Sequence, residues 1–192
     1  VPLIFYPPPR PPESGEAFRF ENAASATFSG MTYRISRLLI AKSEVLPPEY
    51  YAYSPLLAGK QTILYVKLEV SNAGGKRASA PAEGVLILGD GTRALDAFRL
   101  RDYIQAGTAL PHIQSDYLSP GERYIVGFWL STDAAPNEIR ELKLVLDCPS
   151  ESGKAECLGE IGRPRRDVIL NAVLRNGKPL EPGVYSEVSA DS

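Results

Sequence analysis

The stretch Thr62–Asn72, TILYVKLEVSN, constrains the fold of this 192-residue chain more than any other feature. Its apolar positions on one side are Leu64, Val66, Leu68 and Val70. An apolar residue at every second position is typical of a β-strand that has one face on a core and the other in water. The residues expected in water are Tyr65, Lys67, Glu69 and Ser71. The strand should end at Asn72, because Gly74 and Gly75 follow it.

Similar strand-like runs, closed by Gly, Asn or Pro, recur along the chain. They are Phe18–Phe28, Met31–Ile40, Val85–Leu88, Arg93–Ala97, Arg123–Leu130, Ile139–Asp147, Val168–Leu174 and Gly183–Val188. Asp90-Gly91 separates two of them, and Asp-Gly predicts a hairpin because both central positions of a type I′ turn need positive φ. We expect the last two runs to pair as a C-terminal hairpin.

Three segments depart from regular alternation. The apolar phase shifts between Ile35 and Leu38, which predicts a β-bulge near Ser36 or Arg37. The first strand should be broken at the alanine-rich stretch Ala23–Ala26. The segment Phe98–Tyr117 has no clear period and leaves room for a short helix around residues 100–105.

About eight strands without a 3.6-residue stripe predict an all-β fold, an antiparallel immunoglobulin-like β-sandwich. We expect a proline-rich extended spacer at residues 1–16, the sandwich at 17–147, and a disulfide loop and C-terminal hairpin at 148–192 packed on the same domain. The residues expected to share one core are Val66, Leu68, Val126, Phe128, Leu142 and Leu144.

Four motifs occur in a characteristic order along the chain. They are YVKLEVSNAGGK at 65–76, LILGDGTRALD at 86–96, LSPGERYIVGFWLS at 118–131 and ELKLVL at 141–146. In these motifs the chain resembles a bacterial extracellular family of unknown function with an immunoglobulin-like, telokin-like domain, sometimes described as immunoprotective. The resemblance implies that fold and an exported, often lipid-anchored location. It implies no catalytic residue.

Charge and hydropathy argue against several functional classes. The net charge is −2, from 21 basic and 23 acidic residues, which does not suit a nucleic-acid binder. No apolar run reaches the roughly 18 to 20 residues of a membrane helix. The chain begins at Val1 and is proline-rich at once, as it would be after removal of a signal peptide or lipid anchor. A recombinantly expressed fragment would begin in the same way. We therefore expect an extracytoplasmic protein that is periplasmic, secreted or surface-anchored.

Cys148 and Cys157 enclose a short polar segment that contains Pro149 and Gly153. We expect a disulfide that clamps this loop, because two thiols without a nearby histidine are too few ligands for a metal. Two reduced thiols in a cytosolic protein are the alternative. No cofactor is expected.

His112 is the only histidine, and Ser115 and Asp116 follow it closely. Residues this close on an extended segment usually diverge, so a catalytic relay is not expected. The sequence around Asp90-Gly91 matches the dinucleotide-binding fingerprint, but no βαβ unit surrounds it.

Tyr50, Tyr51 and Tyr53 lie on a proline-flanked loop and are the most suggestive ligand-binding residues. Tyrosines on such a loop could bind a glycan or a peptide, or they could fold down over the end of the sandwich. The sequence thus predicts a non-enzymatic binding or structural module of the bacterial envelope, whose partner is an envelope protein or a glycan. The alternative is a hydrolase or isomerase with a site built from loops.

Overall fold

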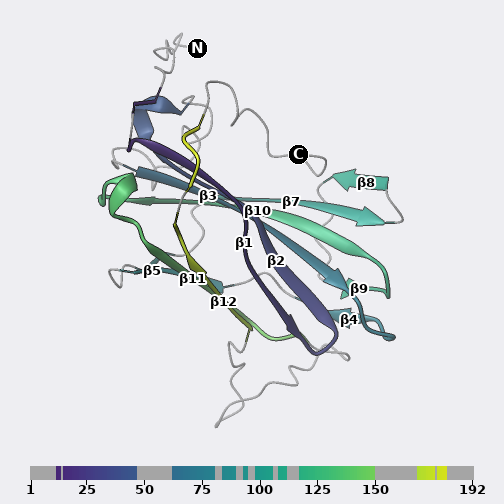
Figure 1. Ribbon diagram of the computed structural model, residues 1–192. Coiled ribbons are helices and arrows are strands. Elements are labelled where there is room, and N and C mark those ends of the chain that lie inside the picture. Colours follow the sequence, from purple (N-terminus) through teal and green to yellow (C-terminus); the bar gives the residue numbers. More distant parts are fainter. Residues whose placement is uncertain are drawn as a thin grey trace.

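The computed structural model (Figure 1) describes residues 12–13, 15–46, 62–80, 84–89, 93–94, 98–105, 108–111, 117–149, 168–175 and 177–180. Within these ranges the regular structure is β-strand, apart from two 3₁₀ turns, Ser43–Val45 (η1) and Pro136–Glu138 (η3). The all-β class predicted from alternation is confirmed. In the described part, no helix is long and apolar enough to cross a membrane.

The larger sheet has six strands, and every neighbouring pair is antiparallel. Their order is β1 (Ala17–Phe28), β2 (Met31–Lys42), β3 (Thr62–Asn72), β10 (Arg123–Thr132), β7 (Phe98–Gln105) and β8 (Thr108–Pro111). The predicted strand Thr62–Asn72 is confirmed, and it lies near the centre of this sheet.

The smaller sheet is a second antiparallel layer (Figure 1). Its order is β12 (Val168–Val173), β11 (Glu141–Leu146), β5 (Gly84–Leu88) and β6 (Arg93–Ala94). A short pair, β4 (Ala78–Ser79) and β9 (Tyr117–Leu118), completes the described strands. β5 and β6 pair as the Asp-Gly signal predicted. β12 pairs with β11, while 183–188, its expected hairpin partner, lies outside the described residues.

The main core lies between the two sheets, which makes the fold sandwich-like. All six predicted core residues belong to it. The expectation for the opposite face of β3 was wrong in part, because Tyr65 and Lys67 are each only 4% exposed. A second apolar cluster covers part of that outer face, formed by Ala17, Leu39, Ala41, Val45, Leu46, Ile63, Tyr65 and Leu180.

The helix suggested around residues 100–105 is wrong. These residues belong to β7, which pairs with β10 over its length, for example Tyr103 with Tyr124. A strand next to a fully formed neighbour gains a ladder of backbone hydrogen bonds, and this long-range pairing outweighs a weak local pattern.

Two bulges lie next to each other in β1 and β2. The predicted bulge in β2 is confirmed between Ile35 and Arg37. The first strand is not broken at its alanines; it continues, with a register shift between Glu21 and Ala24. Asn22 in this shift has φ of 50°, a left-handed conformation that Asn tolerates better than most residues.

Candidate functional site

Most of the residues singled out in the sequence lie outside the described residues. This holds for Tyr50, Tyr51, Tyr53, His112 and Cys157. Cys148 is described and lies buried just after β11, with 4% of its surface exposed. The tyrosine site and the disulfide therefore stay predictions.

The structure draws attention to a different place, where the edge strands of the two sheets meet. β1 is the edge of the larger sheet, β12 is the edge of the smaller, and the two strands pack against each other (Figure 1). After β12 the chain crosses from one sheet to the other through residues 174–175 and 177–180, which we call the strap.

Backbone hydrogen bonds hold the strap at both ends. The N–H of Leu174 donates to the carbonyl oxygen of Arg140 at 2.8 Å, next to the smaller sheet. Arg19 in β1 and Lys178 exchange two backbone bonds, of 2.8 and 3.2 Å. Leu174 belongs to the main core and Leu180 to the outer cluster. The strap therefore joins both apolar clusters around one open side of the sandwich.

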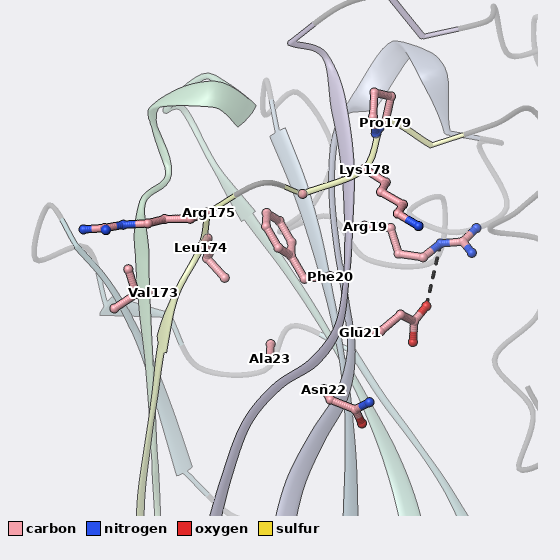
Figure 2. Close-up of a pocket in the computed structure, with 11 residues that line it drawn as sticks. Arg19, Phe20, Glu21, Asn22, Ala23, Val173, Leu174, Arg175, Lys178 and Pro179 are labelled. Atoms are coloured by element: carbon pink, nitrogen blue, oxygen red, sulfur yellow. Dashed lines mark ion pairs between the residues drawn. The ribbon is translucent and has the colours of Figure 1, made fainter.

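A groove of about 620 Å³ lies between the strap and β1 (Figure 2). Its lining from β1 consists of Arg19, Phe20, Glu21, Asn22 and Ala23. Its lining from β12 and the strap consists of Val173, Leu174, Arg175, Gly177, Lys178 and Pro179. The volume is in the range typical of sites for small molecules or short peptide segments.

The bulge in β1 shapes one wall of the groove. Asn22 and Ala23 have no partner in the register of β2, so β1 bends where the strap leaves it. The Asn22 side chain is held by Arg34, whose guanidinium donates to its Oδ1 at 3.0 Å.

Phe20 forms an apolar part of the groove. Figure 2 shows its ring on the strap side of β1, near Leu174, while Arg19 and Glu21 point to the other side. The strap passes close to this ring at Gly177, where an added Cβ would lie 2.5 Å from Cζ of Phe20. A glycine at 177 therefore lets the strap rest against the ring.

The polar lining carries an excess of positive charge. Among the lining residues that the structure describes, Glu21 is the one carboxylate, and it is within 3.9 Å of Arg19 Nε and 3.2 Å of Arg37 Nε. Arg175 and Lys178 are exposed, and neither has an ion-pair partner in the part of the chain that the structure describes. Figure 2 shows Arg175 on one side of the strap and Lys178 and Arg19 on the other.

A charged network lies beside the groove, on the outer face of the larger sheet. Glu69 accepts hydrogen bonds from Arg34 at 2.7 Å and from Arg123 at 3.0 Å. Burial raises the pKa of Glu69, but the two arginines outweigh it and hold that pKa below its ordinary value. Burial, followed by the nearby Arg37, lowers the pKa of Lys67. This network supports the bulges, since Arg34 also binds Asn22.

A second hollow, of about 460 Å³, lies at the end of β11 and is lined by Glu138 and Glu141 among others. The Glu138 carboxylate accepts the backbone N–H of Ala135 at 3.1 Å and so closes the 3₁₀ turn η3. Two carboxylates in one hollow are the minimum that acid–base chemistry on a glycoside requires. Within the described ranges, no group of three or more His, Cys, Asp or Glu residues could hold a metal ion.

Sequence reasoning missed the groove. Its two walls are about 150 positions apart along the chain, at 19–23 and 173–179. One local signal was available: Arg175 and Lys178 bracket an Asn-Gly pair, so cations are gathered on a turn-prone segment.

Comparisons with known proteins assign no family. No family model matches the chain, and no curated protein matches it. A solved structure described as the X-ray structure of Northeast Structural Genomics Consortium target SoR45 is 10% identical, over 85% of this chain and 96% of that one. Its TM-score is 0.33, too low to carry an argument about fold or function.

Proposed function

We propose that this chain is a non-enzymatic binding module of the bacterial envelope, built on an immunoglobulin-like sandwich, which binds its partner in the groove between β1 and the strap. The sequence motifs that resemble an exported immunoglobulin-like family support the location outside the cytoplasm. The sandwich-like arrangement of the two sheets is compatible with that family's fold.

The observation that carries the proposal is the combination of an apolar floor with cations that have no partner in the described structure. The half-buried ring of Phe20 offers apolar surface and packs on the buried core that includes Leu174, while Arg175 and Lys178 stand exposed beside it. Binding sites commonly combine an apolar surface with a few polar groups that fix orientation. The partner is an envelope protein or an envelope glycan, and Tyr50, Tyr51 and Tyr53 remain a second predicted contact.

A groove-filling substitution tests the proposal. Ala23 lines the groove and lies between β1 and β12 in Figure 2, so Ala23→Trp should fill the groove, whereas Ser25→Trp places the same side chain at an exposed position two residues away. Binding to purified envelope proteins and to an array of envelope glycans is measured for both variants. We expect Ala23→Trp to weaken binding at least tenfold and Ser25→Trp to leave it unchanged.

Thermal melting of both variants controls for folding. Pro179→Trp, at an exposed position on the opposite wall, replaces Ala23→Trp if that variant does not fold. Equal binding by the filled and control variants would show that the partner binds elsewhere.

The second candidate function is a hydrolase whose carboxylates are Glu138 and Glu141. It is favoured by their presence in one hollow. Turnover of chromogenic glycosides and esters by the wild-type chain, abolished in both Glu138→Gln and Glu141→Gln, would establish this function and contradict the non-enzymatic one.

A further inference from the structure

Within the residues that the structure describes, the outer edge of β1 is open beside the groove. Arg19 exchanges two backbone hydrogen bonds with Lys178, so its N–H and C=O point away from β2. In an antiparallel strand alternate residues direct these groups to the same edge, which places the N–H and C=O of Glu21 there too. The Arg19–Lys178 pair is an isolated bridge, and no described residue pairs with the backbone of Glu21 on this side.

The bulge extends this open stretch by two residues. Asn22 and Ala23 are skipped by the register of β2, and Asn22 is exposed. Unpaired N–H and C=O groups on an edge strand act as a template for another strand. The strap already pairs with this edge of β1 at Lys178, so the edge accepts an added segment.

The side chains around this edge select the kind of strand that could add to it. The half-buried ring of Phe20 offers an apolar surface, and Arg175 and Lys178 lie on opposite sides of the strap (Figure 2). A segment with an apolar side chain flanked by carboxylates would match both the apolar surface and the two cations. A neutral or basic segment would leave the cations uncompensated.

On the basis of the binding role proposed above, we propose that the groove takes an extended acidic peptide segment of a partner protein. The segment adds to β1 along 21–23, next to the Arg19–Lys178 bridge, and its carboxylates pair with Arg175 and Lys178. Strand addition of this kind draws affinity from backbone hydrogen bonds and specificity from the alternate side chains. A glycan could use the cations but has no repeating N–H and C=O groups for the edge.

The experiment measures the fluorescence anisotropy of a labelled peptide in which Glu and Val alternate, titrated with the full chain. We expect Arg175→Glu and Lys178→Glu each to weaken binding at least fivefold, and the double variant at least twentyfold. Lys143→Glu is the matched control, because Lys143 is also exposed but lies on the outer face of β11. It should bind as the wild type does.

A second comparison tests the backbone ladder separately from charge. The same peptide with N-methyl groups on alternate residues keeps its carboxylates but loses the N–H groups of one edge. We prepare two versions, one for each set of alternate residues. The version that loses the N–H groups facing β1 should bind at least tenfold more weakly than the other. On the protein, Glu21→Pro removes a backbone N–H of the open edge, whereas Glu21→Gln keeps that N–H and removes only a negative charge, so Glu21→Pro should weaken binding of the acidic peptide and Glu21→Gln should not.

Equal binding of both methylated peptides, or binding of a soluble polyuronic acid with the same dependence on Arg175 and Lys178, would overturn strand addition. Failure of the alternating peptide to bind the wild type would overturn the inference as well. The proposed binding role would still stand if Ala23→Trp abolished binding of an envelope partner in the earlier experiment.

Discussion

The side-chain amide of Asn72 donates a hydrogen bond of 2.8 Å to the backbone carbonyl oxygen of Leu118, and this bond ties the last residue of β3 to β9. The same amide nitrogen donates to the carbonyl of Lys76 at 2.8 Å, and the side-chain oxygen accepts the N–H of Gly74 at 2.9 Å. One buried residue thus satisfies three backbone groups, two in the loop after β3 and one in β9.

Asn72→Ala should lower the free energy of unfolding by about 2–4 kcal/mol, because two carbonyls and one N–H lose their partner. Asn72→Asp should cost at least as much at neutral pH, since a carboxylate cannot donate to the two carbonyls. Urea denaturation measures both. Ser71→Ala, at the preceding and less buried position, should stay within about 0.5 kcal/mol of the wild type. A similar small loss for Asn72→Ala would mean that water replaces its bonds.

Two fully buried tyrosines of the main core provide a matched pair. The hydroxyl of Tyr124 donates to the carbonyl of Ala80, whereas the hydroxyl of Tyr33 has no hydrogen-bond partner in the described structure. Burial raises the pKa of Tyr33 above its ordinary value, so this hydroxyl stays neutral. Tyr124→Phe should cost about 1–2 kcal/mol, and Tyr33→Phe should be neutral or slightly stabilising. Equal losses in chemical denaturation would contradict the difference in bonding.

Glu69 should make the stability sensitive to acid. Its pKa is lower in the folded chain than the ordinary value of 4.5, so its contribution is present above about pH 4.5 and is lost as the pH falls further. At pH 7, Glu69→Gln should cost about 1–2 kcal/mol, a figure kept small because both arginines are more than 40% exposed.

Urea midpoints measured from pH 7 down to pH 3 check this prediction. The gap between the wild type and Glu69→Gln should close as the pH falls. Glu141→Gln is the control, since Glu141 is exposed and has no ion pair in the described part of the chain. A constant gap would show that the substitution acts through packing rather than through charge.

The hairpin between β1 and β2 turns through Ser29 and Gly30, with φ of 48° and 78°. Two positive φ values in a two-residue loop indicate a type I′ turn, in which Asn-Gly is the favoured pair. Ser29→Asn should therefore raise the free energy of unfolding by about 0.5 kcal/mol. Gly30→Ala should lower it by more than 1 kcal/mol, because of its φ and because the added Cβ would lie 3.2 Å from Cα of Gly74. A melting temperature that rises for Ser29→Asn and falls for Gly30→Ala would support the turn type.

The predicted disulfide between Cys148 and Cys157 remains to be tested. A closed loop of about ten residues should contribute about 2.7 kcal/mol in the chain-entropy model. Thiol labelling of the denatured, unreduced protein should find no free cysteine, and reduction should lower the melting temperature. Two labelled thiols in protein made under oxidising conditions would exclude the bond.

The strands with clean alternation could be predicted because burial of one face requires an apolar residue at every second position. Val66 and Phe128 lie in different strands, yet each is buried on the same core as predicted. The bulge near Ser36 was visible for the same reason, since one inserted residue shifts the apolar phase. The hairpin at Ser29-Gly30 was not recognised, although Gly at the second position is a fair signal for it.

The candidate site was decided by the tertiary structure alone. The alternation predicted that Tyr65 and Lys67 face solvent. In the structure, a second apolar cluster that includes residues of η1 and Leu180 covers part of that face of β3. The groove likewise forms only because Lys178 returns to pair with Arg19. The sequence alone determined the strands that alternate cleanly and the face of each that lies on the main core, because alternation is a local consequence of strand geometry. Which edges meet, and which cations stand beside them, depended on contacts between distant segments that leave no periodic pattern.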